Sequence, residues 1–347
     1  MPKIGLWIAL DNPSISVAEA CILLEGYGIQ YKVLERVGRL LILDIKNINI
    51  LNRLIEAVYR SANIKGAIII LKEYTHIDKD IISADVRDAI HQYVDIRNEK
   101  LAISIMPYKS TLLDDPPALF IRGIAEMALR GMPVKIDLDN PDKRIVVALP
   151  VDRVYIGLEV VPLHRKGFYS RLPSKRPAQS PHALHPKLAR AMVNLTGAMP
   201  GEMLLDPFCG IGSILMEASL LGINSIGIDI MYKWIEGASI NLHWIEDKIS
   251  DLVCGDTVKG FIRGVKYIAT DPPYGRTTTL AGYGDTKLLI NKFIEISSAI
   301  DSIKRVVFMA PKELPIDLET HGFTEIYKFE IPVHKNLIRV LRVADYG

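Results

Sequence analysis

The sequence predicts an α/β protein, with a C-terminal doubly wound sheet whose last strand is antiparallel and an N-terminal α+β region before it. From residue 203 onward, short apolar strands alternate with helical segments, and four successive strands each end near an aspartate. The last two strands, over residues 324–332 and 335–343, follow each other across Val333-His334 and predict a hairpin. At 347 residues, the chain is long enough for two domains with separate cores.

The N-terminal region mixes strands and helices without a motif that carries chemistry. Apolar β-prone runs predict strands over residues 3–10, 31–34, 40–45, 67–71, 101–106, 134–138, 144–149 and 154–161. Helical spacing and capping residues predict helices that end near residue 25 and that span residues 51–62, 83–94 and 116–129. No nucleophile, metal or phosphate-loop spacing occurs here, so we expect a structural or binding domain.

A basic segment, residues 163–178, separates the two halves. It contains five bases and no acid: Arg165, Lys166, Arg171, Lys175 and Arg176. Phe168 and Tyr169 are interleaved with these bases, and cations that alternate with aromatic rings suit a phosphate backbone with an unpaired base stacked nearby. A solvated linker is the alternative, and the position directly before the second half favours nucleic acid. The net charge of the whole chain is only +2, so a nucleic-acid surface must be local.

The second half begins with a strand, a glycine turn and a helix. A helix over residues 184–195 precedes the strand 203–206, the loop 207–213 and a helix over 214–221. Gly210 and Gly212 let the backbone approach a ligand closely. The third glycine of the dinucleotide fingerprint is replaced by Leu215, so this loop does not argue for a nicotinamide cofactor.

Four aspartates follow four successive strands: Asp206, Asp229, Asp256 and Asp271. Ligands of open α/β sheets bind at the carboxyl ends of the strands, so these side chains predict one site. The set suits a ligand with a cationic end and a nucleoside end, as in S-adenosylmethionine. We expect Asp206 to face the methionyl ammonium or the sulfonium, Asp229 the ribose hydroxyls and Asp256 the adenine.

The corner Asp271-Pro272-Pro273-Tyr274 follows the fourth strand. Two prolines fix φ and lack an N–H, so the strand cannot continue through them. Asp271 and the carbonyl of Pro272 then offer two acceptors to one planar amino group, and Tyr274 offers a ring for stacking. A Pro-rich surface loop is the alternative for the corner alone, and the aspartates upstream favour a site.

These motifs resemble a known family. The order D-P-F-C-G-I-G-S, I-G-I-D, C-G-D and D-P-P-Y-G-R resembles class I Rossmann-like methyltransferases that modify exocyclic amino groups. S-P-H with P-K-L-A-R looks like the motif before the family's first strand. V-K-I-D-L-D-N-P-D and V-Y-I-G-L-E-V resemble the end of a THUMP module. Together they are similar to archaeal tRNA guanine-10 N2-(di)methyltransferases.

The resemblance implies a domain order and a set of site residues. The domains are a ferredoxin-like segment (1–48), a THUMP-like RNA-binding domain (49–162), the basic linker (163–178) and a methyltransferase domain (179–347). The catalytic residues are Asp271, Pro272, Pro273 and Tyr274. S-adenosylmethionine is bound by Pro181, His182, Asp206, Phe208, Cys209, Gly210, Gly212, Asp229, Ile230, Asp256, Thr257 and Asp271. The tRNA is bound by Arg165, Lys166, Phe168, Arg171, Lys175, Arg176 and Arg276.

Several alternatives stay open at this point. Another guanine, at tRNA position 6 or in ribosomal RNA, is the nearest rival, and the same corner serves adenine N6 and cytosine N4 of DNA. An RNA-binding protein with an inactive methyltransferase fold and a nicotinamide dehydrogenase are the other classes. We expect no metal, because Cys21, Cys209 and Cys254 have no ligand spacing. We also expect a cytoplasmic protein without a membrane span. A monomer is one of the oligomeric states left open, and so are one or two methyl transfers.

Overall fold

The computed structural model describes residues 2–46, 50–108, 116–163, 167–259, 263–273, 285–334 and 337–347. The chain divides into two compact units. The first consists of Met1–Pro13, Tyr27–Tyr59 and Ile64–Arg165. The second consists of Ser14–Gly26, Arg60–Asn63 and Lys166–Gly347, so it takes two short pieces from the N-terminal half. Within the described ranges, no helix has the length and hydropathy needed to cross a membrane.

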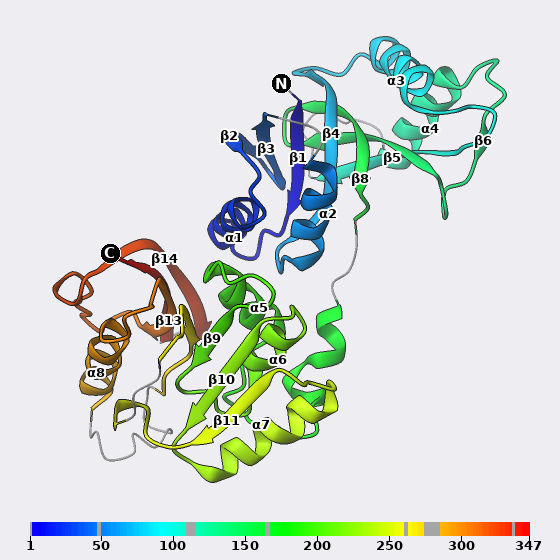
Figure 1. The fold of residues 1–347 in the computed structure, drawn as a ribbon. Helices are drawn as coiled ribbons and strands as arrows, with labels where there is room; N and C mark the ends of the chain where they lie inside the picture. The colour runs from blue at the N-terminus through cyan, green and yellow to red at the C-terminus, as the bar shows by residue number, and fades with distance from the viewer. Residues whose placement is uncertain are drawn as a thin grey trace. The chain divides into compact units, whose positions relative to one another are not determined.

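One eight-stranded sheet forms the first unit, in the order β2-β3-β1-β4-β8-β7-β5-β6 (Figure 1). Its strands are β1 (Lys3–Ile8), β2 (Tyr31–Val37), β3 (Leu40–Ile45), β4 (Ile64–Tyr74), β5 (Lys100–Tyr108), β6 (Lys135–Ile136), β7 (Lys143–Pro150) and β8 (Val154–Val161). Strand β4 pairs with β1 on one side and with β8 on the other. The sequence predicts a domain boundary at residue 48, but the strands before and after this residue belong to one sheet.

The helices of this region are α2 (Leu51–Arg60), α3 (Lys79–Tyr93) and α4 (Pro117–Ala128). Ile90 of α3 and Phe120 of α4 are buried in one cluster with Ile145 of β7. Helix α3 begins before the predicted residue 83, because the Asp78 side chain accepts hydrogen bonds from two N–H groups of its first turn. Residues 79–82 therefore form the first turn of this helix.

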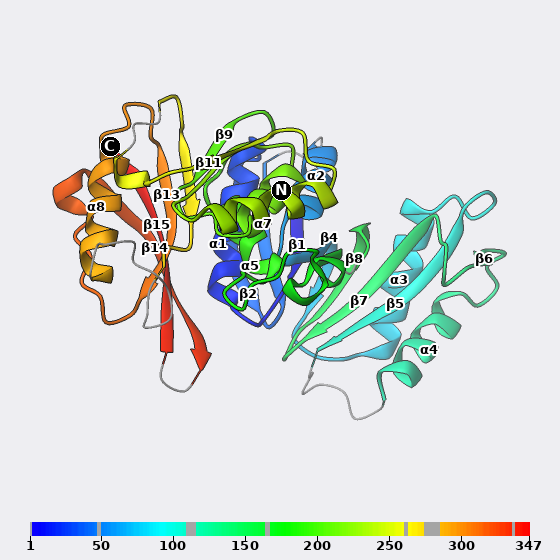
Figure 2. The ribbon, with the colours of Figure 1, turned by 90° about the horizontal axis from the view of Figure 1, so that it is seen from below.

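The second unit contains a seven-stranded sheet in the order β11-β10-β9-β12-β13-β15-β14 (Figures 1 and 2). Its strands are β9 (Met203–Asp206), β10 (Asn224–Asp229), β11 (Ser250–Cys254), β12 (Tyr267–Thr270), β13 (Arg305–Pro311), β14 (Phe323–His334) and β15 (Leu337–Tyr346). Strands β9 to β13 pair in parallel, whereas β15 is antiparallel to both β13 and β14. The predicted doubly wound sheet with an antiparallel last strand is confirmed. Strand β14 runs through Val333-His334, so the hairpin turn does not lie at that pair.

Helices cover both faces of this sheet. They are α5 (Pro186–Leu195), α6 (Ser213–Ser219), α7 (Tyr232–Trp244) and α8 (Thr286–Ser298). Successive strand residues point to opposite faces, so Leu204 packs in the cluster that contains Met192 of α5. Leu205 instead packs in the cluster that contains Phe293 of α8. Because helices bury both faces of this parallel sheet, a ligand can reach it at the carboxyl edge.

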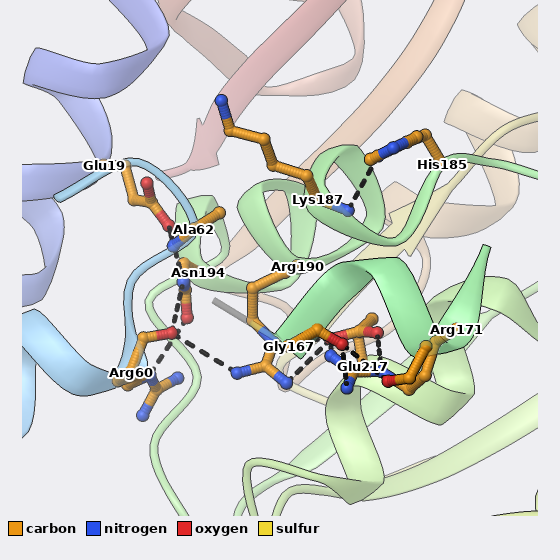
Figure 3. Close-up of polar contacts among 11 residues, drawn as sticks. Glu19, Arg60, Ala62, Gly167, Arg171, His185, Lys187, Arg190, Asn194 and Glu217 are labelled. Atoms are coloured by element: carbon orange, nitrogen blue, oxygen red, sulfur yellow. Dashed lines mark hydrogen bonds and ion pairs between the residues drawn. The ribbon is translucent and has the colours of Figure 1, made fainter. Parts of the chain in front are cut away.

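Helix α1 (Pro13–Gly26) lies largely in the second unit, where Ile15 and Ile22 join the core cluster of α5. Its buried Glu19 accepts hydrogen bonds from the backbone N–H of Ala62 and from the Asn194 amide, both at 2.6 Å (Figure 3). Arg60 donates from Nε to Asn194 Oδ1 at 3.0 Å. The buried carboxylate is thereby satisfied by N–H donors from segments far apart in the sequence.

Candidate active site

The carboxyl ends of four parallel strands bring the predicted aspartates to one cavity. Strands β9 and β10 end at Asp206 and Asp229, while Asp256 and Asp271 follow β11 and β12. Parallel register aligns these ends, since Asp229 lies opposite Cys254 and Gly227 lies opposite Asp206. The cavity encloses about 310 Å³, and all four aspartates line it. This volume is at the lower end of the range for small-molecule sites.

Eleven of the twelve residues predicted for the cofactor line this cavity: Pro181, His182, Asp206, Phe208, Cys209, Gly210, Asp229, Ile230, Asp256, Thr257 and Asp271. Gly212 is not among the lining residues. It has a φ of 81° and is the residue before α6, and a Cβ there would lie 3.3 Å from the Ala238 Cβ. Its role is to form the turn and allow close packing, rather than to line the site.

The loop between β9 and α6 is held against the end of β10. Gly210 donates its N–H to Asp229 Oδ2 at 3.1 Å, and Met231 donates its N–H to Asp229 Oδ1 at 2.9 Å. Both bonds favour the ionised carboxylate, but burial has the larger effect and raises the pKa of Asp229. Asp229 is thus oriented by the backbone before any ligand arrives.

Asp206 is the most deeply buried acid of the site, with 2% of its surface exposed. It accepts hydrogen bonds from Thr270 Oγ1 at 2.7 Å and from the N–H of Phe208 at 3.3 Å. Burial raises the pKa of Asp206 to about 7, and the nearby carboxylates of Asp271 and Asp229 add to the effect. A cation placed beside it would reverse this shift.

Two further predicted residues hold the loop after β11. Thr257 donates its hydroxyl to the carbonyl of Pro207 at 2.6 Å, which joins this loop to the glycine loop. Asp256 accepts the N–H of Val258 and lies 3.3 Å from Lys259 Nζ. Burial raises the pKa of the Cys209 thiol, so this side chain is disfavoured as a thiolate nucleophile.

Asp271, Pro272 and Pro273 also line the cavity, beside the residues predicted for the cofactor. Tyr274 and Arg276 lie outside the described residues, and their roles stay predictions. Within the described ranges, no group of three or more His, Cys, Asp or Glu side chains could hold a metal ion. The site therefore joins a set of oriented carboxylates to a proline corner with an acid and a carbonyl.

Comparison with known proteins agrees with this geometry. Residues 173–315 match the family model described as UPF0020, RMKL-like, methyltransferase domain. A protein of Methanothermococcus thermolithotrophicus named "Probable tRNA (guanine(10)-N2)-dimethyltransferase" is 34% identical over 169 residues, which cover 45% of this chain and 96% of that protein. The chain belongs to the archaeal tRNA (guanine(10)-N2)-dimethyltransferase family.

Longer family members match over part of their length. The tRNA (guanine(10)-N2)-dimethyltransferase of Methanothermobacter thermautotrophicus is 33% identical over 214 residues, 61% of this chain and 64% of that protein. The chain thus spans less than two thirds of the length of this relative. The crystal structure of TrmN from Thermus thermophilus matches with a TM-score of 0.53 at 17% identity, over 100% of this chain and 99% of that one, which shows a shared fold.

Lys233, Trp234 and Arg339 also line this cavity and were not among the residues predicted from the sequence. Lys233 and Trp234 are in the first turn of α7, with Lys233 Nζ 4.5 Å from the Trp234 ring centroid. Arg339 Nη1 lies 3.2 Å from Asp271 Oδ2. The sequence signal that could have identified Arg339 is its position as a single base within the otherwise apolar run 337–341.

The basic segment divides into buried and exposed bases. Arg176 has 2% of its surface exposed and donates to Ser213 Oγ at 2.6 Å and to the carbonyl of Leu184 at 3.0 Å. The prediction that Arg176 contacts RNA is wrong in this structure, because its guanidinium is enclosed by protein acceptors. Arg171 forms an ion pair with the buried Glu217, which also pairs with Arg190 (Figure 3).

Among the described bases and aromatic rings of this segment, Tyr169 and Lys175 are exposed. Tyr169 is 72% exposed, and Lys175 Nζ lies 3.3 Å from its ring centroid. Phe168 instead is half-buried and packs against the core of the second unit. Arg165 and Lys166 lie outside the described residues. The exposed cation and ring make up the Tyr169–Lys175 patch.

Proposed function

We propose that this chain transfers a methyl group from S-adenosylmethionine to the exocyclic N2 amino group of guanine in tRNA, with guanosine-10 as the target. The observation that carries the proposal is a single cavity lined by Asp206, Asp229 and Asp256 together with the Asp271-Pro272 corner. The family relatives named above support the choice of guanine and of tRNA.

The lining residues fit S-adenosylmethionine by their chemistry. Asp206 is a buried acid suited to a cationic ammonium or sulfonium, and cationic binding would offset the cost of its ionisation. Asp229 is oriented by two N–H donors and retains carboxylate lone pairs for a ribose diol. Asp256 has the acceptors that an adenine amino group needs. The bound cofactor would supply an electrophilic methyl group on sulfur.

The corner residues would act on the target amino group. The lone pair of a guanine amino group is delocalised into the ring, so the nitrogen is a poor nucleophile. Asp271 and the carbonyl of Pro272 would accept its two N–H bonds, favour a pyramidal nitrogen and direct the lone pair at the methyl group. Orientation then supplies much of the acceleration. Asp271 is the nearest acceptor for the proton that leaves.

The target base must leave its stack, which costs a few kcal/mol. We propose that the Tyr169–Lys175 patch contacts the tRNA, since a ring with a cation beside it suits an exposed base and its phosphate. We further propose that the first unit contains a THUMP-like RNA-binding domain within residues 49–162. The resemblance of its C-terminal part to the end of a THUMP module supports this assignment.

Nucleoside mass spectrometry of unmodified tRNA treated with the protein tests the proposal. The expected result is N2-methylguanosine or its dimethyl form at position 10, located by digestion and fragment sequencing. Asp271→Asn serves as the inactive control, and duplex DNA and ribosomal RNA serve as competing substrates. Methylation at a different guanine would move the target, and no methylation of any RNA would overturn the proposal.

A further inference from the structure

The ion pair between Arg339 and Asp271 joins the last strand of the sheet to the corner. Asp271 follows β12, and β12 pairs with β13, which in turn pairs with β15. In that register Arg339 lies opposite Pro311, at the carboxyl end of β13. Neighbouring strands are about 4.8 Å apart, so Arg339 must reach across β13 to contact Asp271. A long side chain is required at this position of β15.

The contact between the two side chains is a charge-assisted hydrogen bond. Arg339 donates from Nη1 to Oδ2 of Asp271. A carboxylate has about four lone-pair positions, of which this bond occupies one. The side chains of the pair are 20% and 15% exposed, which shields the interaction from solvent more than at a surface pair. A guanidinium stays charged and accepts no proton, so Arg339 cannot serve as a base.

The electrostatic setting explains why a cation is needed there. The other titratable or charged groups that line the cavity are His182, Asp206, Cys209, Asp229, Lys233 and Asp256. Three of these are carboxylic acids, and the negative charge of Asp271 contributes to the raised pKa of the buried Asp206. Like charges that share a site disfavour the ionised form of each acid, whereas a cation within about 4–6 Å favours it.

We propose that Arg339 is a positioning residue that keeps Asp271 ionised and directs its carboxylate toward the target amino group. This inference rests on the proposed function, because it assigns Asp271 the role of N–H acceptor. Two effects follow. Loss of the ion pair lets the Asp271 carboxylate rotate away from the amino group, and it makes ionisation of Asp271 harder in a cavity rich in acids.

Steady-state kinetics on tRNA tests the inference with Arg339→Gln, Arg339→Lys and a matched control. The control is Lys312→Gln, which removes the Lys312–Glu330 ion pair at 2.8 Å; neither residue lines the cavity. We expect kcat to fall about 10- to 100-fold in Arg339→Gln, as for misplaced catalytic groups, with the Kd for S-adenosylmethionine changed less than about threefold. The acidic limb of the kcat–pH profile should move to higher pH. Arg339→Lys should recover part of the rate, and Lys312→Gln should match the wild type.

A rise in the KM for tRNA at unchanged kcat and unchanged pH profile would overturn the inference and make Arg339 a tRNA-binding residue. A uniform loss of folded protein by circular dichroism in both Arg339 variants would make it a structural residue, and this too would overturn it. Wild-type activity in the same assay separates this inference from the proposed function. Should the wild type methylate no RNA, ¹³C NMR of the Asp271 carboxyl, assigned with Asp271→Asn, remains informative. Its titration midpoint should then rise in Arg339→Gln and stay unchanged in Lys312→Gln; equal midpoints would refute the inference.

Discussion

Replacement of Asp206 by Asn should change how the stability of the second unit depends on pH. Burial holds the pKa of Asp206 at about 7, against an ordinary value of 3.8 for an aspartate. The folded state therefore binds this proton more tightly than the unfolded state does, and the free energy of unfolding falls as pH rises through the interval between the two values. At about 1.4 kcal/mol per pH unit, ionisation of Asp206 lowers the free energy of unfolding at pH 8 by about 4 kcal/mol. About 2 kcal/mol of this loss arises between pH 5.5 and pH 8.

Asn keeps the shape and removes the charge, so Asp206→Asn should lose this pH dependence. The measurement is urea unfolding of the ligand-free chain at pH 5.5 and pH 8, followed by tryptophan fluorescence. Trp234 and Trp244 lie in the second unit, and a Trp7→Phe background removes the signal of the first unit. We expect the loss of stability between pH 5.5 and pH 8 to be about 2 kcal/mol smaller in the variant than in the wild type.

The exposed Asp251 on β11 provides the matched control. Asp251→Asn should follow the wild type at both pH values, because it removes one surface carboxylate and leaves the buried Asp206 in place. The reasoning would be refuted if Asp206→Asn and the wild type lost the same stability between pH 5.5 and pH 8. Equal behaviour would mean that Asp206 is already ionised at pH 5.5 in the folded protein.

Five other substitutions address the cofactor, the reaction and the RNA. Asp271→Asn should reduce methyl transfer by at least about 100-fold in single-turnover assays, while calorimetry shows S-adenosylmethionine binding within a few-fold of wild type. Asp229→Ala should weaken that binding by about 1.5–3 kcal/mol in calorimetry, since it removes charged hydrogen bonds, and an unchanged affinity would exclude it from the ribose site. Lys175→Gln should lower the slope of log K against log salt for tRNA by about 1, and Tyr169→Ala should cost about 1–3 kcal/mol of binding. Arg176→Met should leave that slope unchanged and instead lower the melting temperature, because it removes buried hydrogen bonds; the reverse pattern would restore Arg176 to the RNA surface.

The carboxyl-edge aspartates were predictable because their placement depends on local order. A strand that ends at Asp206, followed by a turn and a helix, must return its next parallel strand with the same direction, so Asp229 emerges at the same edge. The same reasoning extends to Asp256 and Asp271. Strand, turn and helix signals thus sufficed to bring four side chains to one cavity.

Arg339 and helix α1 were not predictable in this way, because long-range pairing decides their positions. The contact of Arg339 with Asp271 depends on the register that sets Arg339 opposite Pro311, and no local pattern encodes that register. Ile15 and Ile22 of α1 belong to the core of the second unit, although both lie within the predicted N-terminal segment 1–48. Neither apolar spacing nor capping says which sheet a helix will cover.

The basic segment shows why charge alone does not identify an interface. Lys175 and Arg176 are neighbours with the same charge, yet one is exposed beside Tyr169 and the other is buried. The buried guanidinium donates to the carbonyl of Leu184 and to the hydroxyl of Ser213, and both residues line the cavity from separate segments of the chain. Arg171 next to it is paired with Glu217 of α6. Arg176 therefore joins two walls of the cavity, whereas Arg171 fixes the segment to α6. The Tyr169–Lys175 patch is the described part of this segment that we propose for RNA contact.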